Sequence, residues 1–138
     1  MDIAIYEEIY ERLDKFLEHN GDLCYTPKLV HFPKAGQNYP YVVFEEVRNN
    51  AGKIYLGDIP DRVSNLGYRV RIYAKTKGKA TKMDIARKVA EYVDYFLSEL
   101  GLRQISFNPD PLIADGDLYG IILMYNANFY NNRREIIL

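Results

Sequence analysis

The sequence predicts one α+β domain over residues 1–138, a two-layer sandwich in the order α-β-β-α-β-β. Two helices are expected to pack on one face of a four-stranded, mainly antiparallel sheet. Two stretches place apolar residues at helical spacing, and four others have the composition or the alternation of β-strands. The length of 138 residues suits a single domain with its own core.

Residues 2–19 are expected to form the first helix, because apolar side chains recur there at intervals of three and four residues. These side chains are Tyr6, Ile9, Tyr10, Leu13, Phe16 and Leu17. The opposite face is acidic and includes Glu7 and Glu11. Such a face is usually solvated, and the alternative is an interface with another subunit.

The next segment, residues 22–40, contains Pro27, Pro33 and Pro40, which disfavour a long helix and leave room for a short edge strand at 23–25 or 29–32. A strand rich in β-branched and aromatic residues follows over 41–48. Its neighbouring residues Glu45 and Glu46 must point to opposite faces. We therefore expect one of them toward the covered side of the sheet, near its rim or paired with a base.

The connection over residues 50–66 is much longer than a tight hairpin turn. It contains Ile54, Tyr55 and Leu56, which a free loop would expose to water. Our hypothesis is that this segment extends as a β-arm and packs on a neighbouring subunit.

The run from Gly67 to Gly101 predicts a strand that leads into a long amphipathic helix. Alternation over 68–75 indicates a half-buried strand with one polar face. Apolar residues from Ile85 to Leu100 then recur at helical spacing. Thr81 with Asp84 resembles a capping box, and Gly101 stands where a C-terminal glycine in the left-handed conformation belongs.

Basic residues gather at this strand–helix joint, with Asp84 as the single acid among them. Three interpretations remain open: a solvated basic edge, a surface for an acidic protein partner, or a nucleic-acid site in which Tyr68 and Tyr73 stack on bases. The acidic first helix would allow a self-complementary, head-to-tail arrangement that closes into a ring. The cluster comprises Arg69, Arg71, Lys75, Lys77, Lys79, Lys82, Arg87 and Lys88.

Two further strands are expected, a short one at 103–107 and a long, central one at 118–130 that is covered on both faces. The remaining residues, 131–138, carry Arg133 and Arg134 before an apolar tip. This composition is typical of a C-terminal arm rather than of core.

No constellation in the sequence indicates an enzyme, a cofactor or a metal site. Cys24 and His31 lack a recognisable orienting group, and turn chemistry explains Asp110, Asp115 and Asp117 better than calcium binding does.

Composition narrows the class of protein. One cysteine excludes an internal disulfide, and the net charge of -1 argues against a whole-surface nucleic-acid binder. The chain has 13 tyrosines, and this favours an interaction protein because tyrosine is enriched at protein interfaces. The N-terminus has no signal-peptide pattern and no stretch suits a membrane span, so we expect an intracellular protein without membrane partners.

The order of these motifs resembles the neck and tail-terminator (tail completion) proteins of tailed bacteriophages, including their minor capsid-type members. The resemblance covers residues 3–130. It lies in Phe32-Pro33-Lys34, in residues 39–46 and 68–75, in the long helix that follows, and in the closing strand at 118–125.

The resemblance implies a non-enzymatic subunit of a hexameric ring that caps the tail tube and joins it to the head. Its partners would be further copies of itself, the tail tube protein and the head-completion or connector protein, with non-specific DNA in the lumen. The protein would be made in the host cytoplasm and reside in the virion. Residues 50–66 and 131–138 are the contact candidates. An adjacent neck ring fits the resemblance equally, and the alternative is a nucleic-acid-binding module that uses residues 69–88.

Overall fold

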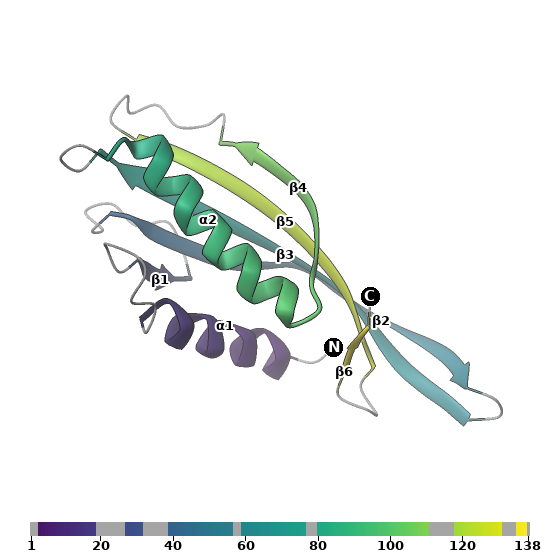
Figure 1. Ribbon diagram of the computed structural model, residues 1–138. Helices are drawn as coiled ribbons and strands as arrows, with labels where there is room; N and C mark the ends of the chain where they lie inside the picture. Colours follow the sequence, from purple (N-terminus) through teal and green to yellow (C-terminus); the bar gives the residue numbers. More distant parts are fainter. Residues whose placement is uncertain are drawn as a thin grey trace.

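A computed structural model describes residues 3–18, 27–31, 39–56, 59–76, 80–110, 118–130 and 135–137. Within these ranges the chain forms two helices and a six-stranded sheet (Figure 1). In chain order the elements are α1 (Ile3–Glu18), β1 (Lys28–Val30), β2 (Tyr41–Leu56), β3 (Ile59–Lys75), α2 (Lys82–Glu99), β4 (Arg103–Pro109), β5 (Leu118–Tyr130) and β6 (Glu135–Ile137).

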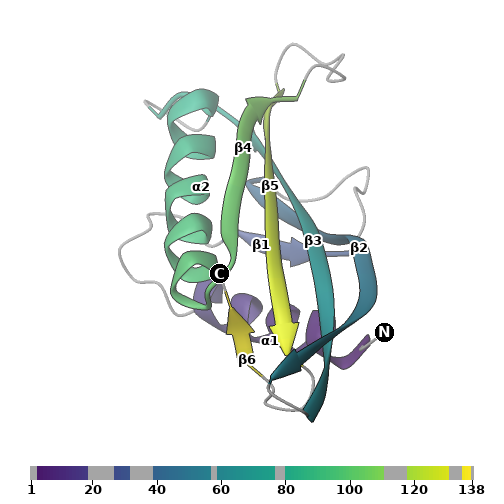
Figure 2. The ribbon, with the colours of Figure 1, turned by 90° about the vertical axis from the view of Figure 1, so that its right-hand side faces the viewer.

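The strands lie in the order β1-β2-β3-β5-β4, and β6 pairs with β5 (Figure 2). β1 runs parallel to β2, and the other described pairings are antiparallel. The α+β class is confirmed, whereas the prediction of four strands is wrong because β1 and β6 join the sheet. Both are three residues long, too short for a period of two to be visible in the sequence.

One face of the sheet carries the main core. Strand residues such as Tyr68, Val70 and Ile72 are fully buried there against apolar residues of both helices. α2 contacts β3 and β5, while α1 contacts β1 and α2. β5 is central, but the expectation that both of its faces are covered is wrong, because Ile121 and Leu123 are buried whereas Ile122 and Met124 are partly exposed.

Both ends of α2 are built as the sequence predicts. The Thr81 side chain accepts a hydrogen bond from the Asp84 N–H at 3.2 Å, which caps the N-terminus. At the other end the N–H groups of Gly101 and Leu102 donate to the carbonyls of Ser98 and Leu97, each at 3.0 Å. This is a Schellman motif, and it requires the positive φ of 97° at Gly101.

The hairpin of β2 and β3 is longer than the rest of the sheet. β1 pairs with β2 only as far as Val43, and β5 pairs with β3 only from Val63 onward. Residues 53–56 and 59–62 therefore form a two-stranded arm among the described strands, and the arm projects from the layered part of the molecule (Figure 1). Residues 50–66 are thus mostly paired strand rather than loop.

A β-bulge between Glu46 and Arg48 lies at the base of this arm. Gly67 stands opposite it, where an added Cβ would lie 3.1 Å from the Arg48 Cβ and 3.3 Å from a Val47 methyl carbon. A bulge bends the strand that contains it and increases the local twist. The bulge and the missing side chain at Gly67 together set the direction in which the arm leaves the sheet.

We predict that Gly101→Ala lowers the free energy of unfolding by about 1–2 kcal/mol, because an L-residue is strained in the left-handed region. Urea unfolding followed by circular dichroism measures this. The matched control is Ser98→Ala in the exposed last turn of α2, which should cost nothing measurable. Equal stability of the two variants would contradict the role assigned to the Gly101 turn.

Candidate functional site

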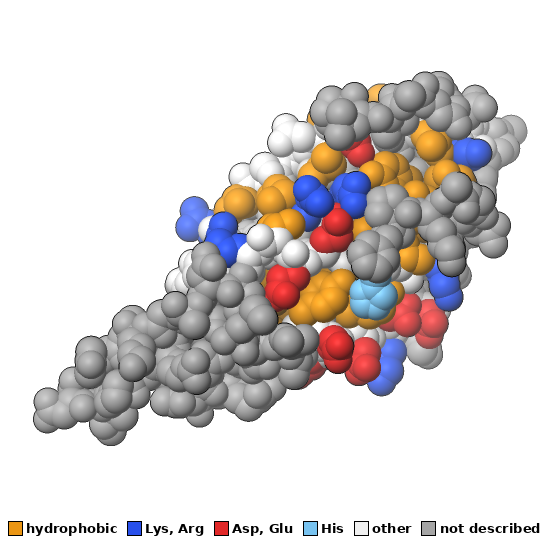
Figure 3. All heavy atoms as spheres, turned by 180° about the vertical axis from the view of Figure 1, so that it is seen from behind, with side chains coloured by type: hydrophobic (Ala, Val, Ile, Leu, Met, Phe, Trp, Pro, Cys, Tyr) orange, Lys and Arg blue, Asp and Glu red, His pale blue; other side chains and the backbone are white. Residues whose placement is uncertain are grey.

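Two arginines share one carboxylate on the sheet face that the helices leave open. Glu45 on β2 lies directly opposite Arg69 on β3, and Arg71 follows on the same face. Both guanidinium groups bind in the bidentate manner. Arg69 donates to the two carboxylate oxygens at 3.0 and 3.2 Å, and Arg71 donates to them at 2.8 and 3.0 Å. Figure 3 shows basic and acidic side chains together among apolar ones on this face.

The environment of this cluster is intermediate between surface and core. The side chains of Glu45, Arg71 and Arg69 are 19%, 21% and 39% exposed. Partial burial raises the pKa of Glu45, but the hydrogen bonds from both arginines outweigh it and hold the pKa below its ordinary value. Burial lowers the pKa of Arg71, and its bond to Glu45 reverses the shift. The cluster thus remains ionised at neutral pH.

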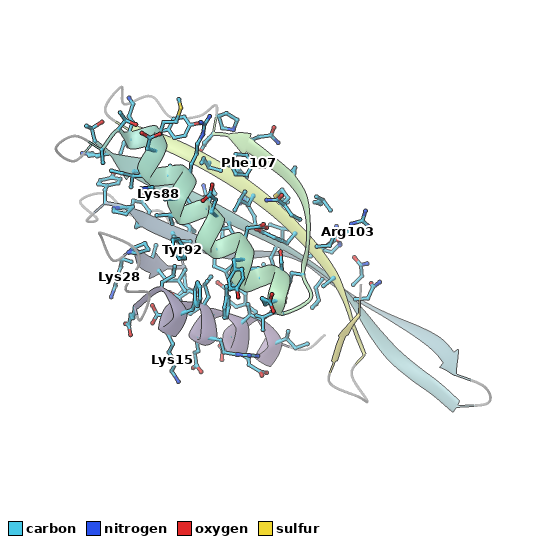
Figure 4. All side chains as sticks on the ribbon, in the orientation of Figure 1. Lys15, Lys28, Lys88, Tyr92, Arg103 and Phe107 are labelled. Carbon is cyan, nitrogen blue, oxygen red and sulfur yellow. The ribbon has the colours of Figure 1, made fainter. Side chains whose placement is uncertain are left out.

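The structure does not bring the predicted basic cluster together as one surface. Arg69 and Arg71 are bound to Glu45 on the open face. Arg87 and Lys88 are exposed on α2, which covers the opposite face of the sheet (Figure 4). Lys75 lies over the Tyr39 ring, with 4.7 Å between its Nζ and the ring centroid. Lys77 and Lys79 lie outside the described residues.

Aromatic residues form a second, smaller core beside the arginines. Tyr41, Val43 and Tyr73 are buried on the open face, and Tyr39 packs against them. The Tyr73 hydroxyl donates to an Asp110 carboxylate oxygen at 2.9 Å. Partial burial raises the pKa of Tyr73 to about 12, and the bond to Asp110 adds to the shift. Asp110 is therefore hydrogen-bonded to a tyrosine, whereas Asp115 and Asp117 lie outside the described residues.

The acidic face of α1 is exposed as predicted, including Glu7 and Glu11. Two tyrosines tie the helix to the sheet. Tyr6 stacks on Phe44 with 5.3 Å between ring centroids and donates its hydroxyl to the Phe44 carbonyl, while Tyr10 donates to the Leu29 carbonyl at 3.2 Å. Burial raises the pKa of Tyr6 to about 12, so the hydroxyl remains a donor at neutral pH.

His31 contributes to this attachment of α1 to the sheet. Its ring stacks on Tyr10 with 4.0 Å between centroids, and its Nδ1 lies 3.0 Å from the Tyr6 hydroxyl. Cys24, the other member of the pair considered in the sequence, lies outside the described residues. The aromatic neighbours of His31 come from α1, which the spacing along the sequence did not reveal.

The arm residues Ile54, Tyr55 and Leu56 lie in the distal part of β2, and Leu56 pairs with Ile59 at the tip. Their contact with a neighbour stays a prediction. At the C-terminus, β6 pairs with Asn128, Phe129 and Tyr130 of β5. Part of the predicted C-terminal arm is therefore a strand of the sheet, whereas Arg133 and Arg134 lie outside the described residues.

Sequence reasoning missed Glu45 as the partner of the two arginines. The signal that could have identified it is the antiparallel register, because residues directly opposite each other share a face. It also missed the exposed apolar side chains of β4, Ile105 and Phe107. A seven-residue strand with the sequence RQISFNP gives no clear indication of which residues the helices cover.

Among the described residues no group of three or more histidines, cysteines and acids could hold a metal ion. In the same part of the chain, no helix is long and apolar enough to cross a membrane. Comparisons with known proteins found no family model and no curated protein that matches the chain.

We predict that Glu45→Gln destabilises the fold by roughly 1–2 kcal/mol at pH 7, between the values for surface and buried ion pairs. Because folding lowers the pKa of Glu45, its ionised carboxylate contributes its full stabilisation of the fold above the ordinary pKa of 4.5. That stabilisation is lost as the pH falls from 4.5 through the lowered pKa of the folded state. Urea unfolding at pH 7 and pH 3 should therefore show a stability difference that shrinks in acid. The control is Glu11→Gln on the exposed face of α1. A loss of stability in Glu45→Gln that is the same at pH 7 and at pH 3 would contradict this prediction.

Proposed function

We propose that this chain is a structural virion protein of a tailed bacteriophage, a tail-terminator or head–tail joining subunit that acts by assembling into a ring. The ring caps the tail tube and connects it to the head. The single observation that carries the proposal is the arm formed by the distal part of β2 and β3, which projects beyond both helices (Figure 1).

An isolated two-stranded hairpin is only marginally stable in water. The described strands add no third strand to residues 53–62, although the sequence there includes Ile54, Tyr55, Leu56 and Ile59. An arm of this kind gains stability when a partner surface covers it. Contact between subunits through such an arm fits the resemblance to phage ring proteins in residues 3–130.

The geometry gives less support to the alternative of a nucleic-acid-binding module. Its basic residues are divided between the two faces of the sheet, and the charge of Arg69 and Arg71 is partly neutralised by Glu45. A continuous positive surface, which phosphate binding favours, is not formed by the described part of this cluster.

The experiment replaces residues 53–62 by Asn-Gly, which closes the hairpin at the Gly52–Val63 pair with a two-residue turn. We expect the full chain to form hexameric rings in native mass spectrometry and to cap tubes of the tail tube protein from the same genome in electron micrographs. The shortened chain should stay monomeric with an unchanged far-ultraviolet circular dichroism spectrum of its helices.

A full chain that remains monomeric at high concentration, both alone and with the tube protein, would overturn the proposal. Binding of the full chain to DNA at low salt, with a steep loss of affinity as salt rises, would instead favour the nucleic-acid alternative.

A further inference from the structure

Four arginines gather on the open face of the sheet. Arg48 on β2 lies opposite Gly67 on β3, and an added Cβ at Gly67 would lie 3.3 Å from the Arg48 Cζ. Gly67 pairs in turn with Asn126 on β5, which pairs with Arg103 on β4. Residues directly opposite each other share a face of the sheet, so this row lies beside the cluster around Glu45. The arginine face, as we call it, comprises Arg48, Arg69, Arg71 and Arg103 with Glu45.

The arginine face has a positive charge that Glu45 does not neutralise. Four arginines and one carboxylate leave three positive charges in excess. A guanidinium group has five N–H groups, and Glu45 accepts hydrogen bonds from two of those of Arg69. The Arg69 side chain is 39% exposed, so its other N–H groups can reach an acceptor on a second molecule. This part of the sheet therefore suits a partner that presents carboxylates.

The exposed side of α1 carries carboxylates in a separate stripe. At 3.6 residues per turn, four acids of this helix lie within about 60° of one another around its axis. The bases Arg12 and Lys15 lie to one side of these acids, toward Phe16. Phe16 stacks on Phe96 of α2, so the acids face away from that contact. Figure 3 shows acidic side chains along the border that α1 forms, apart from the basic side chains on the sheet. The acidic stripe, as we call it, comprises Glu7, Glu11, Asp14 and Glu18.

The two surfaces match in length and in charge. Glu7 and Glu18 are separated by about 16 Å along the helix axis. On β3, Arg71 and the row at Gly67 are separated by about 13 Å. The four carboxylates of the stripe thus correspond to three excess positive charges over a similar length. Duplex DNA would present roughly nine charges over 16 Å, far more than the arginine face neutralises. The acidic stripe is therefore the better-matched partner.

We propose that the acidic stripe on α1 of one copy packs against the arginine face of the next copy. Within one copy, α1 packs on the opposite side of the sheet, so its stripe does not reach the arginine face of the same copy. The inference rests on the proposed ring assembly and names a contact within it. Stripe and face are different patches, so the contact is head-to-tail and can close into a ring. The opposite charges also fix the register between copies.

Charge substitutions on each surface test the contact. The face variant combines Arg103→Glu with Asn128→Asp, which keeps the oxygen that accepts from Asn65 at 3.1 Å. The stripe variant combines Glu7→Lys with Glu11→Lys. All four substituted side chains are exposed, so the monomers should keep their circular dichroism spectra and thermal unfolding. In native mass spectrometry, each variant should need a roughly tenfold or higher concentration for half-assembly, because attraction between the surfaces is lost.

The combined variant, with all four substitutions, shows whether the two surfaces meet. If they do, each pair of substitutions removes the same attraction, and the combined loss should stay roughly tenfold. Two unrelated effects would instead multiply to roughly a hundredfold loss. The matched control is Arg87→Glu with Lys88→Glu, which reverses two exposed charges on α2 and should assemble as the parent chain does.

The outcomes separate the two proposals. Rings that form unchanged in the face and stripe variants, a combined loss that multiplies, or an equal loss in the α2 control would each overturn this contact and leave ring assembly in place. DNA binding by the parent chain that the face variant abolishes, with assembly unchanged, would assign the arginine face to nucleic acid instead. A parent chain that stays monomeric overturns both proposals.

Discussion

The alternation of side chains along β3 is the constraint on which the rest of the structure depends. β3 is hydrogen-bonded to β2 on one side and to β5 on the other. Its even-numbered residues from Leu66 to Ala74 are fully buried under the helices, while Arg69, Arg71 and Tyr73 face the other way. A register slip of one residue would place the arginines in the main core and remove Val70 and Ile72 from it, so the register is strongly specified.

Tyrosine hydroxyls connect the helices to the sheet. Tyr6 and Tyr10 reach from α1 to carbonyls of β2 and β1. Tyr125, fully buried on β5, donates to Asp94 on α2 at 2.8 Å, and burial raises its pKa far above the ordinary value. Each ring fills apolar space while its hydroxyl satisfies a polar group, a combination that phenylalanine lacks. The abundance of tyrosine therefore has a structural use here in addition to the interface role suggested by composition.

The parts of the fold that depend on local sequence could be predicted. The cap at Thr81, the turn at Gly101 and the buried stripe of α2 follow from spacing over a few residues. The pairing of Glu45 with Arg69 and Arg71 depends on which strands are neighbours and in what register, information that a period of two does not contain. For a related reason β6 was missed as a strand, and β1 was expected only as one of two alternative short edge strands. Each is stabilised by its partner strand rather than by its own three residues.

The base of the arm shows how a local irregularity can set the direction of a projecting hairpin. The bulge opposite Gly67 bends β2, and a polar ladder spans the strands just beyond it, where Arg48 donates to Asn65 and Asn65 donates to Asn128 at 3.1 Å. These hydrogen bonds anchor the arm to β5 before it leaves the sheet. The base of the arm is therefore held by three strands. In the proposed ring this pre-organisation would lower the entropic cost of ordering the arm against a partner.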